Sequence, residues 1–412
     1  MSEITIVDDL HPEDQAMVQA LFSRDPGPVA EKLAALDQEK RGRFMDRYYV
    51  GYGHKSIGDC GVTTVFVENI SLYEAKVIED SPLFAGQESS TRYIDFSKQG
   101  MIDLSKARQR KAQTWLEYYQ ILFDAAKDYY QRLYPNSKPK AIETLSFDLA
   151  RSLLPLSMKT SVAWTTSLSH AREHIRSMAA HPCPRIQSLA EELFIKFYQA
   201  YPHSFSENDL RADRLPSDRI WSEPQPTLSE LELEYDIADL ECLSRRADFN
   251  SRVQVGGRLD FGSLRDLHRH RKAFIPLPFY SIVHRSKFLD DDLYAEQIIK
   301  IMGEGFHREL VDYFESLSKN NHEDLFTYPM GVRIPVEMIT GIAHLRYILE
   351  LRTRPSVHPT LRQFMLGIVS ELEKTSHGRM YRNHLSIDTR PAAFEVFDQR
   401  ANEDIVERSD GS

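Results

Sequence analysis

Two polar clusters in the chain have side chains that could bind phosphate. The segment His268–Lys272 alternates histidines with basic residues and runs into an apolar stretch, Ala273–Leu277. The segment Gly86–Tyr93 combines small hydroxyls, an amide and a carboxylate and ends in an Arg-Tyr pair. Arginine suits phosphate because its planar fork donates two parallel charge-assisted hydrogen bonds, and nearby hydroxyl and backbone donors complete an anion cradle. The alternatives are a solvated charge run for the first cluster and a polar helix-capping turn for the second.

Neighbouring residues disfavour a metal site and a thiol nucleophile. His170 and His174 lie four residues apart and face one side of the expected helix, which is a spacing that metal pairs use. Arg172 and Arg176 would repel a cation there, and the order differs from the zinc-protease motif, so we expect no metal. Cys183 has little around it to stabilise a thiolate, and we expect a buried, inert thiol.

Chain length, net charge and cysteine content limit the class of protein. A chain of 412 residues is long enough for two or three structural units. The net charge of -10 opposes non-specific binding to nucleic acid, and no apolar run approaches the roughly 20 residues of a membrane span, so we expect neither partner. Three widely spaced cysteines and a start without a secretory signal favour a cytoplasmic location.

Hydrophobic periodicity predicts alternating strands and long helices. Val62–Val67 is β-branched and Arg252–Phe261 alternates, so both are expected to be strands. Ala107–Leu133 and Asp291–Leu317 carry apolar residues at helical spacing, and each is expected to form one long helix. The fold class is therefore α/β, more closely α+β.

The same order of elements recurs in the two halves of the chain. In each half a proline-marked break, at Pro155 and at Pro329, precedes a helix that carries a His-x-Arg sequence, His170–Arg172 and His344–Arg346. Such self-similarity indicates a duplication.

The expected domain organisation follows from that duplication. We expect a first repeat over residues 1–201, a linker or arm over 202–238, a second repeat over 239–400 and a disordered tail over 401–412. The linker is rich in proline and acidic residues, and the tail is polar and acidic.

These pieces resemble the flavin-dependent thymidylate synthases, the thymidylate synthase complementing protein family. The family signature is R-H-R-x-x-S-x-N-E-x-S-x-R-Y, preceded by G-H-x-S. In the first half, Gly53–Ser56 and Gln87–Tyr93 match two parts, whereas Asp80–Pro82 stands where R-H-R belongs. In the second half, Arg269–Arg271 supplies R-H-R, whereas Pro276–Ile282 stands in the other part. Each copy has lost what the other keeps.

The family's C-terminal arginines are divided in the same way. Arg151 precedes a Leu-Pro as the family's substrate arginine does, and the second half has Leu325 there. Leu349–Arg352 resembles the family's F-L-x-L-R, whose arginine polarises the pyrimidine. The chain departs from the family at two places. The family's N-A-R, which contacts the flavin, is replaced by Ser167–Ser169, or by His170–Arg172 if the alignment contains a three-residue gap. The family's glutamine that contacts the pyrimidine is replaced by Asp266.

The resemblance implies a role for each matching residue. Arg352 is the implied catalytic residue. The implied substrate-binding residues are Glu88, Ser89, Ser90, Thr91, Arg92, Arg151, Asp266 and Arg269. The implied cofactor-binding residues are His54, Ser56, Glu88, His170, Arg172, Arg269, His270 and Arg271.

The resemblance also implies the architecture and the reaction. It implies two repeats, each a twisted, mostly antiparallel sheet with long helices. The reaction is conversion of dUMP to dTMP with FAD as cofactor and with methylene-tetrahydrofolate and NADPH as co-substrates. Family members are homotetramers with shared sites, so a homodimer of this chain would be a pseudo-tetramer. The alternatives are carbon-5 modification of another pyrimidine nucleotide and a non-catalytic nucleotide- or flavin-binding scaffold.

Overall fold

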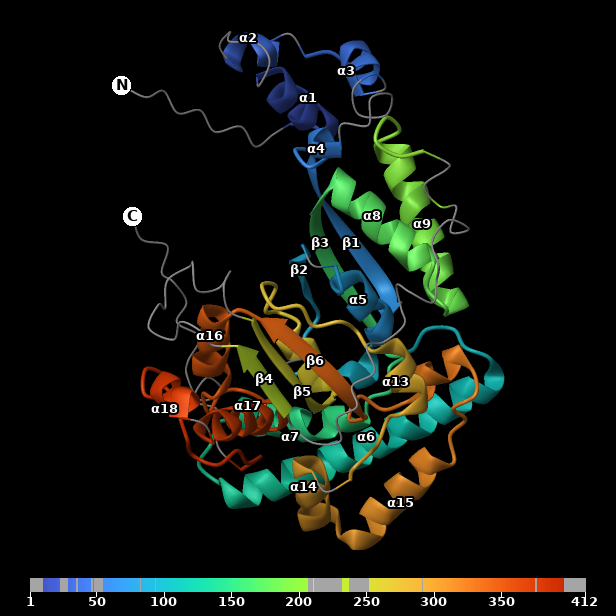
Figure 1. Ribbon diagram of the computed structural model, residues 1–412. Coiled ribbons are helices and arrows are strands. Elements are labelled where there is room, and N and C mark those ends of the chain that lie inside the picture. Colours follow the sequence, from blue (N-terminus) through green and yellow to red (C-terminus); the bar gives the residue numbers. More distant parts are fainter. Residues whose placement is uncertain are drawn as a thin grey trace. The chain divides into compact units, whose positions relative to one another are not determined.

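A computed structural model describes residues 10–22, 29–34, 36–45, 47, 55–81, 83–92, 94–206, 210, 232–236, 252–290, 292–374 and 376–395 (Figure 1). Internal contacts divide the chain into two compact units, each assembled from several segments. Unit 1 comprises Met1–Glu68, Val77–Glu88 and Ser161–Ser222. Unit 2 comprises Asn69–Lys76, Ser89–Thr160 and Glu223–Ser412. Most of the expected linker and all of the expected tail lie outside the described residues.

The core of unit 1 is a three-stranded sheet in the order β1-β3-β2, formed by β1 (Val62–Ser71), β3 (Lys159–Ser167) and β2 (Ala85–Glu88). β2 and β3 run antiparallel, with Ala85 opposite Thr165 and Glu88 opposite Val162. Helices α8 (Leu168–Ala179) and α9 (Pro184–Ala200) pack together beside this sheet (Figure 1). Trp164 of β3 fills the space between them, with its ring 5.7 Å from that of His174 and 6.1 Å from that of Phe197.

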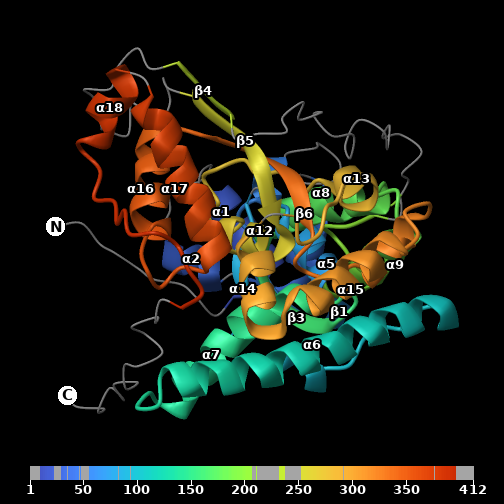
Figure 2. The same cartoon turned by 90° about the horizontal axis from the view of Figure 1, so that it is seen from below.

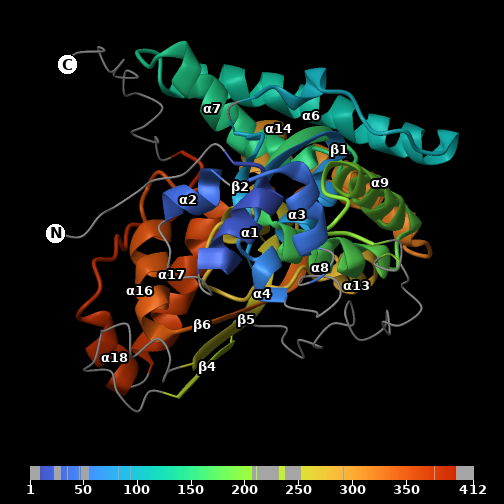
Figure 3. The same ribbon diagram turned by 90° about the horizontal axis from the view of Figure 1, so that it is seen from above.

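Short helices near the N-terminus form a smaller cluster in unit 1. α1 (Pro12–Phe22) contacts α2 (Val29–Ala34), α3 (Gln38–Phe44) and α4 (Lys55–Gly58), as Figure 3 shows. Buried Ala16, Ala20, Met45 and Ile57 make the apolar centre of this cluster. An ion pair between Arg41 and Asp14, 2.9 Å apart, ties α3 to α1.

The core of unit 2 is an antiparallel sheet in the order β4-β5-β6. β5 (Arg252–Asp260) is the central strand, between β4 (Glu232–Asp236) and β6 (Arg333–Thr340). Figure 2 shows α16 (Ile342–Arg352) and α17 (Pro359–Glu373) beside this sheet. α5 (Leu72–Glu79) begins in unit 2 and ends in unit 1. Unit 2 also contains the α-helices α12 (Phe261–Leu267), α13 (Phe279–His284) and α18 (Ser376–Arg382). Its 3-10 helices include η2 (Phe96–Lys98), η3 (Arg151–Leu153) and η6 (His322–Thr327).

The predicted strands and the first predicted long helix are confirmed. The strand expected at Val62 is β1, and the one expected at Arg252 is β5. The expected helix is α6 (Lys106–Leu133), which is capped by Ser105. A short turn joins it to α7 (Pro139–Ala150), and the two helices pack together. One face of α6 buries aromatic and aliphatic side chains at helical spacing: Trp115, Tyr119, Leu122, Ala126 and Tyr130.

The second long helix was predicted wrongly as one element. It is divided into α14 (Leu293–Met302) and α15 (Glu304–Glu315) at Gly303, whose φ is 84°. That left-handed conformation is open to glycine without steric penalty, so Gly303 ends one helix and allows the chain to start another in a new direction. The apolar periodicity continues across the break, which is why it predicted a single helix.

The two proline-marked breaks meet each other inside unit 2. Pro155 and Pro329 form an isolated antiparallel bridge. The backbone N–H of Leu156 donates to Tyr328 O at 2.8 Å, and that of Met330 donates to Leu154 O at 2.7 Å. Gly331 allows the close approach, since a Cβ there would lie 2.8 Å from Ser152 O. Segments that occupy the same place in the predicted repeats therefore pair with one another.

None of the helices in the described residues is long and apolar enough to cross a membrane.

Asp292 caps α14 at an energetic cost. Its Oδ1 accepts from Ala295 N at 2.9 Å, whereas Oδ2 is buried and has no hydrogen-bond partner among the described residues. Burial raises the pKa of Asp292 to about 6, with a further rise from Asp260 that Arg333 partly offsets. Because the folded-state pKa lies above the unfolded one, stability is greatest below pH ~4 and falls as pH rises through about 6.

Asp292→Asn should therefore stabilise the protein at pH 8, because asparagine keeps the capping acceptor and removes the charge. The expected gain is about 1–3 kcal/mol of unfolding free energy at pH 8 and close to zero at pH 4, measured by urea denaturation at both values. Asp312→Asn, at an exposed position on α15, is the control and should change neither value. An equal effect of Asp292→Asn at both pH values would contradict this account.

Candidate functional site

The polar loop that follows β2 is held by an arginine from α12. Arg265 donates from Nη1 to Thr91 Oγ1 at 3.2 Å and from Nη2 to Ser89 O at 3.3 Å. Within the loop, Arg92 N donates to Ser90 Oγ at 3.3 Å. These bonds fix the loop against α12, and the hydroxyl protons of Ser90 and Thr91 can still be donated to a ligand.

Arg92 forms a two-pronged ion pair with a buried carboxylate. Its Nε donates to Asp148 Oδ1 at 2.6 Å and its Nη2 to Asp148 Oδ2 at 2.7 Å. Burial opposes ionisation of Asp148, but the charge and hydrogen bonds of Arg92 outweigh it and lower the pKa of that carboxyl. The Nη1 group of Arg92 donates to Ser356 O at 3.4 Å. These bonds hold the Arg92 guanidinium in place.

Arg151 lies in η3 and is 2% exposed. Its Nη2 donates to Asp266 Oδ2 at 3.4 Å, and its Nε has no hydrogen-bond partner among the residues that the structure describes. Burial tends to raise the pKa of Asp266, yet the charges of Arg151, Arg92, Arg269 and Arg352 lower it strongly. Asp266 therefore stays ionised at every physiological pH.

The basic run and Arg352 come together at the end of α12. Arg352, the last residue of α16, donates from Nε to His270 Nε2 at 2.8 Å and from Nη2 to Asp266 O at 2.8 Å. Burial and the neighbouring cations, Arg352 first, lower the pKa of His270 to about 3. His270 is thus neutral, with Nε2 as the acceptor for Arg352. Arg269 is 56% exposed in its side chain and lies 3.9 Å from Asp266, and Arg271 is half-buried nearby in sequence.

We call Arg92, Arg151, Arg269 and Arg352, with Asp148 and Asp266, the arginine cluster. Four guanidinium groups surround two carboxylates, so the cluster carries a surplus of positive charge. Clustered cations in excess of their partners attract an anion, and arginine is the side chain best matched to phosphate or to a polarised carbonyl.

His358 supports the cluster from behind. Its Nε2 meets Asp148 O at 2.9 Å and Tyr294 Oη at 3.2 Å, and its Nδ1 meets Thr360 Oγ1 at 2.8 Å. Burial and the charge of Arg151 lower the pKa of His358 to about 4. A neutral histidine in this place adds no charge to the surplus.

An aromatic surface adjoins His270. The rings of His344 and Tyr347 stack at 5.7 Å, and His270 meets them edge-on at 5.9 and 5.8 Å. Tyr347 is 56% exposed. A flat ligand ring can pack on this exposed surface.

The remaining implied residues lie in unit 1 or outside the description. Glu88 ends β2 opposite Val162. His170, in the first turn of α8, meets Ser167 Oγ at 2.8 Å through Nδ1, and Arg172 follows on the same helix. His54 and the side chain of Ser56 lie outside the described residues. Unit 2 thus brings together Ser89, Ser90, Thr91, Arg92, Arg151, Asp266, Arg269, His270 and Arg352.

Sequence reasoning missed Asp148, Arg265 and His358. Asp148 and Arg265 had a usable signal, because each is a charged residue within a largely apolar helical stretch. A buried charge requires a partner of opposite sign or several hydrogen bonds. His358 lies in a loop before Pro359 and carries no such signal.

The described residues hold no group of three or more histidine, cysteine, aspartate or glutamate side chains placed to bind a metal ion. Cys183 is fully buried at the start of α9, beyond the reach of a substrate.

Part of the chain matches a known protein family. Residues 5–203 match the family described as thymidylate synthase complementing protein. A UPF0159 protein of Chlamydia pneumoniae is 22% identical over 86% of this chain and 83% of its own length.

Two solved structures of the Helicobacter pylori flavin-dependent enzyme thymidylate synthase X, both described with FAD and dUMP, also match. One is 16% identical over 48% of this chain and 95% of its own, with a TM-score of 0.35. The other is 14% identical over 47% of this chain and 96% of its own, with a TM-score of 0.34. The match with the thymidylate synthase complementing protein family thus covers residues 5–203, just under half of the chain.

Proposed function

We propose that the protein catalyses flavin-dependent reductive methylation of dUMP to dTMP, with methylene-tetrahydrofolate and NADPH as co-substrates. The observation that carries the proposal is the arginine cluster, in a chain whose residues 5–203 match this family. A local surplus of positive charge suits a nucleotide phosphate and a pyrimidine whose carbonyls gain negative charge during the reaction.

The two incomplete signatures contribute to one site. Arg92 and Arg151 come from the first half, whereas Asp266, Arg269 and Arg352 come from the second, and all of them lie in unit 2. The Pro155–Pro329 bridge is what a local two-fold axis between two repeats would produce, because a residue at such an axis meets its own counterpart. We therefore propose that the halves are a duplication that pairs as neighbouring subunits do and retains one complete site.

The residues fit the cofactor as well as the substrate. Arg269, implied in both substrate and cofactor binding, offers a mostly exposed guanidinium for a phosphate of dUMP or of FAD. The ring surface of His344 and Tyr347 offers a place for a flat ring. Reduced FAD supplies the hydride when bound, and methylene-tetrahydrofolate supplies the carbon. The implied contacts of Glu88, His170 and Arg172 with the flavin, and of His54 and Ser56, belong to this proposal.

The protein itself binds and orients the substrates and stabilises developing charge. Ser90, Thr91 and the charge of Arg92 hold the nucleotide phosphate, and the Nε of Arg151, which has no hydrogen-bond partner among the described residues, donates to the same ligand. Arg352 stabilises the charge that develops on the pyrimidine, with its fork aimed by His270. No protein nucleophile is required, in agreement with the buried Cys183.

Asp266 favours one alternative substrate. The family has glutamine at this place, whereas an ionised carboxylate can only accept hydrogen bonds. It can read the N3–H of uracil, and it can equally read the amino group of cytosine. dCMP is therefore the second substrate to assay beside dUMP.

A non-catalytic scaffold is the alternative from another class. The ion pair between Arg92 and Asp148 motivates this alternative, because it uses two of the nitrogens of the Arg92 guanidinium. Purified protein that is colourless and forms no dTMP from dUMP, methylene-tetrahydrofolate and NADPH, with FAD added, would favour the scaffold. We further propose a homodimer in the reducing cytoplasm, where Cys60 and Cys183 would stay outside any disulfide.

Arg92→Lys and Arg269→Gln should each weaken dUMP binding at least tenfold, although the two residues come from different halves. Each change removes charge-assisted hydrogen bonds worth ~1.5–3 kcal/mol, and tenfold corresponds to about 1.4 kcal/mol. Arg92→Lys leaves Asp148 with a cation, whereas alanine would strand a buried carboxylate.

Isothermal titration calorimetry on the FAD-loaded protein measures both effects. Arg308→Gln, an exposed change on α15, is the matched control and should stay within twofold of the wild type. If one variant lost dUMP while the other kept dUMP and FAD binding unchanged, two separate sites would replace the shared one.

Arg352→Lys should lower turnover roughly 10²–10³-fold while changing dUMP affinity little. Lysine keeps the charge but loses the fork that bonds His270 and Asp266 O at once. A donor used chiefly in the transition state affects turnover more than ground-state binding. The measurement is dTMP formation under saturating substrates, with dUMP affinity determined in parallel.

Arg346→Lys provides the control on the same helix, because Arg346 pairs with Glu350 at 3.1 Å on a partly exposed face. Its turnover should equal that of the wild type. Equal turnover in Arg352→Lys would remove Arg352 from the catalytic step.

A further inference from the structure

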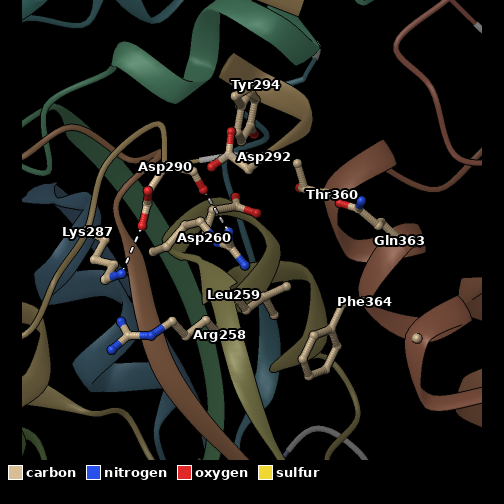
Figure 4. A pocket seen from close by; sticks show the side chains of 12 residues that line it. Arg258, Leu259, Asp260, Lys287, Asp290, Asp292, Tyr294, Thr360, Gln363 and Phe364 are labelled. Atoms are coloured by element: carbon tan, nitrogen blue, oxygen red, sulfur yellow. Dashed lines mark hydrogen bonds and ion pairs between the residues drawn. The ribbon is translucent and has the colours of Figure 1, made fainter. Parts of the chain in front are cut away.

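Unit 2 contains a cavity of about 420 Å³ that adjoins the arginine cluster through Tyr294. Its walls come from the end of β5, the start of β6, the segment before α14 and the first turns of α17 (Figure 4). None of the four arginines of the cluster lines it. The volume falls in the range of ~300–1,000 Å³ typical of small-molecule sites.

Two buried carboxylates face this cavity with unused oxygens. Asp260 is 3% exposed and Asp292 is 6% exposed. Each uses Oδ1 to cap a helix, Asp260 on Ser263 N and Asp292 on Ala295 N, both at 2.9 Å. Each Oδ2 is buried without a hydrogen-bond partner among the described residues. Buried acceptors in folded proteins are nearly always satisfied, so two such oxygens in one cavity call for a donor.

Two guanidinium groups face the same cavity without a carboxylate partner among the described residues. The side chain of Arg258 donates to Arg285 O at 3.2 Å, and that of Arg333 donates to Asp290 O at 3.3 Å. Lys287, by contrast, pairs with Asp290 at 2.9 Å. Burial and the neighbouring Arg333 lower the pKa of Arg258, and the opposing charge of Asp290 outweighs neither of them.

These groups call for a ligand that carries both charges. A metal ion would be repelled by Arg258 and Arg333, and an anion alone would be repelled by Asp260 and Asp292. A zwitterion satisfies all four side chains, and the nearby Leu259 and Phe364 provide apolar surface for a small side chain. We propose that this cavity binds a small zwitterion of the amino-acid class, with its ammonium on Asp260 and Asp292 and its carboxylate on Arg258 and Arg333.

One short helix, α12, connects this cavity to the arginine cluster. α12 begins after its cap Asp260 and ends one residue beyond Asp266. A ligand on Asp260 therefore contacts the start of the short helix whose end carries the carboxylate of the cluster.

The test is calorimetric titration of the full chain with each of the twenty amino acids at pH 7.5. At least one should bind with Kd below ~1 mM, which is ordinary for a small ligand held by few contacts. Asp260→Asn and Arg333→Gln should each weaken that binding at least tenfold. Asparagine keeps the α12 cap, so the Asp260 variant should unfold at the wild-type temperature or above. Glu315→Gln, which breaks a surface pair with Lys319, is the control and should bind as the wild type does.

Three results would overturn the proposal, and none depends on flavin or turnover. One is the absence of binding by any amino acid to protein that unfolds cooperatively. Another is equal binding of the matching primary amine without its carboxylate, which would assign the cavity to a cation. The third is binding of a nucleotide in this cavity with no amino acid bound, shown by loss of the nucleotide in Arg333→Gln.

Discussion

Asp266 is the residue on which the site depends. Four arginines with like charge would repel one another in a buried space unless a carboxylate stood among them, and the lowered pKa of Asp266 records how strongly they hold it ionised. Asp148 does the same for Arg92 from α7. Because the two carboxylates neutralise only two of the four arginines, the cluster keeps a positive potential while the paired charges limit the repulsion. The surplus serves an anionic ligand, and the paired part positions the arginines before that ligand arrives.

The arginines reach Asp266 from distant parts of the sequence, which explains what could be predicted. Arg92, Arg151, Arg269 and Arg352 were identified because motif fragments surround them, and β1, α6 and β5 followed from apolar periodicity. The duplication, the domain boundaries and the role of each residue stay predictions. The break at Gly303 was missed because the apolar pattern runs through it, although a glycine in a helical stretch is a sign of an ending.

Partners in the cluster were harder to predict than the arginines themselves. Asp148 lies between Phe147 and Leu149 on a buried helix, so sequence could show that it needs a cation but not which one. Pairing with Arg92 depends on tertiary packing across more than fifty positions of chain. The same limit applies to His270, whose hydrogen bond with Arg352 joins two segments that no motif relates.

The buried charges of unit 2 have a common consequence for stability. Asp292 and Asp260 keep unsatisfied oxygens, and Arg151 keeps an unsatisfied Nε, in positions where apolar or neutral side chains would be more favourable. Sites that bind charged ligands commonly sacrifice stability in this way. Both sites of unit 2 contain such unsatisfied buried groups, namely the arginine cluster and the cavity lined by Asp260 and Asp292.

The central claim is that one chain holds one flavin and one pyrimidine nucleotide in a site made by both halves. The most direct measurement is quantitative mass spectrometry of the small molecules released when purified protein is denatured after incubation with FAD and dUMP and removal of free ligand. The account predicts both molecules, each at no more than one per chain. Release of two equivalents of either per chain, or of neither, would contradict it.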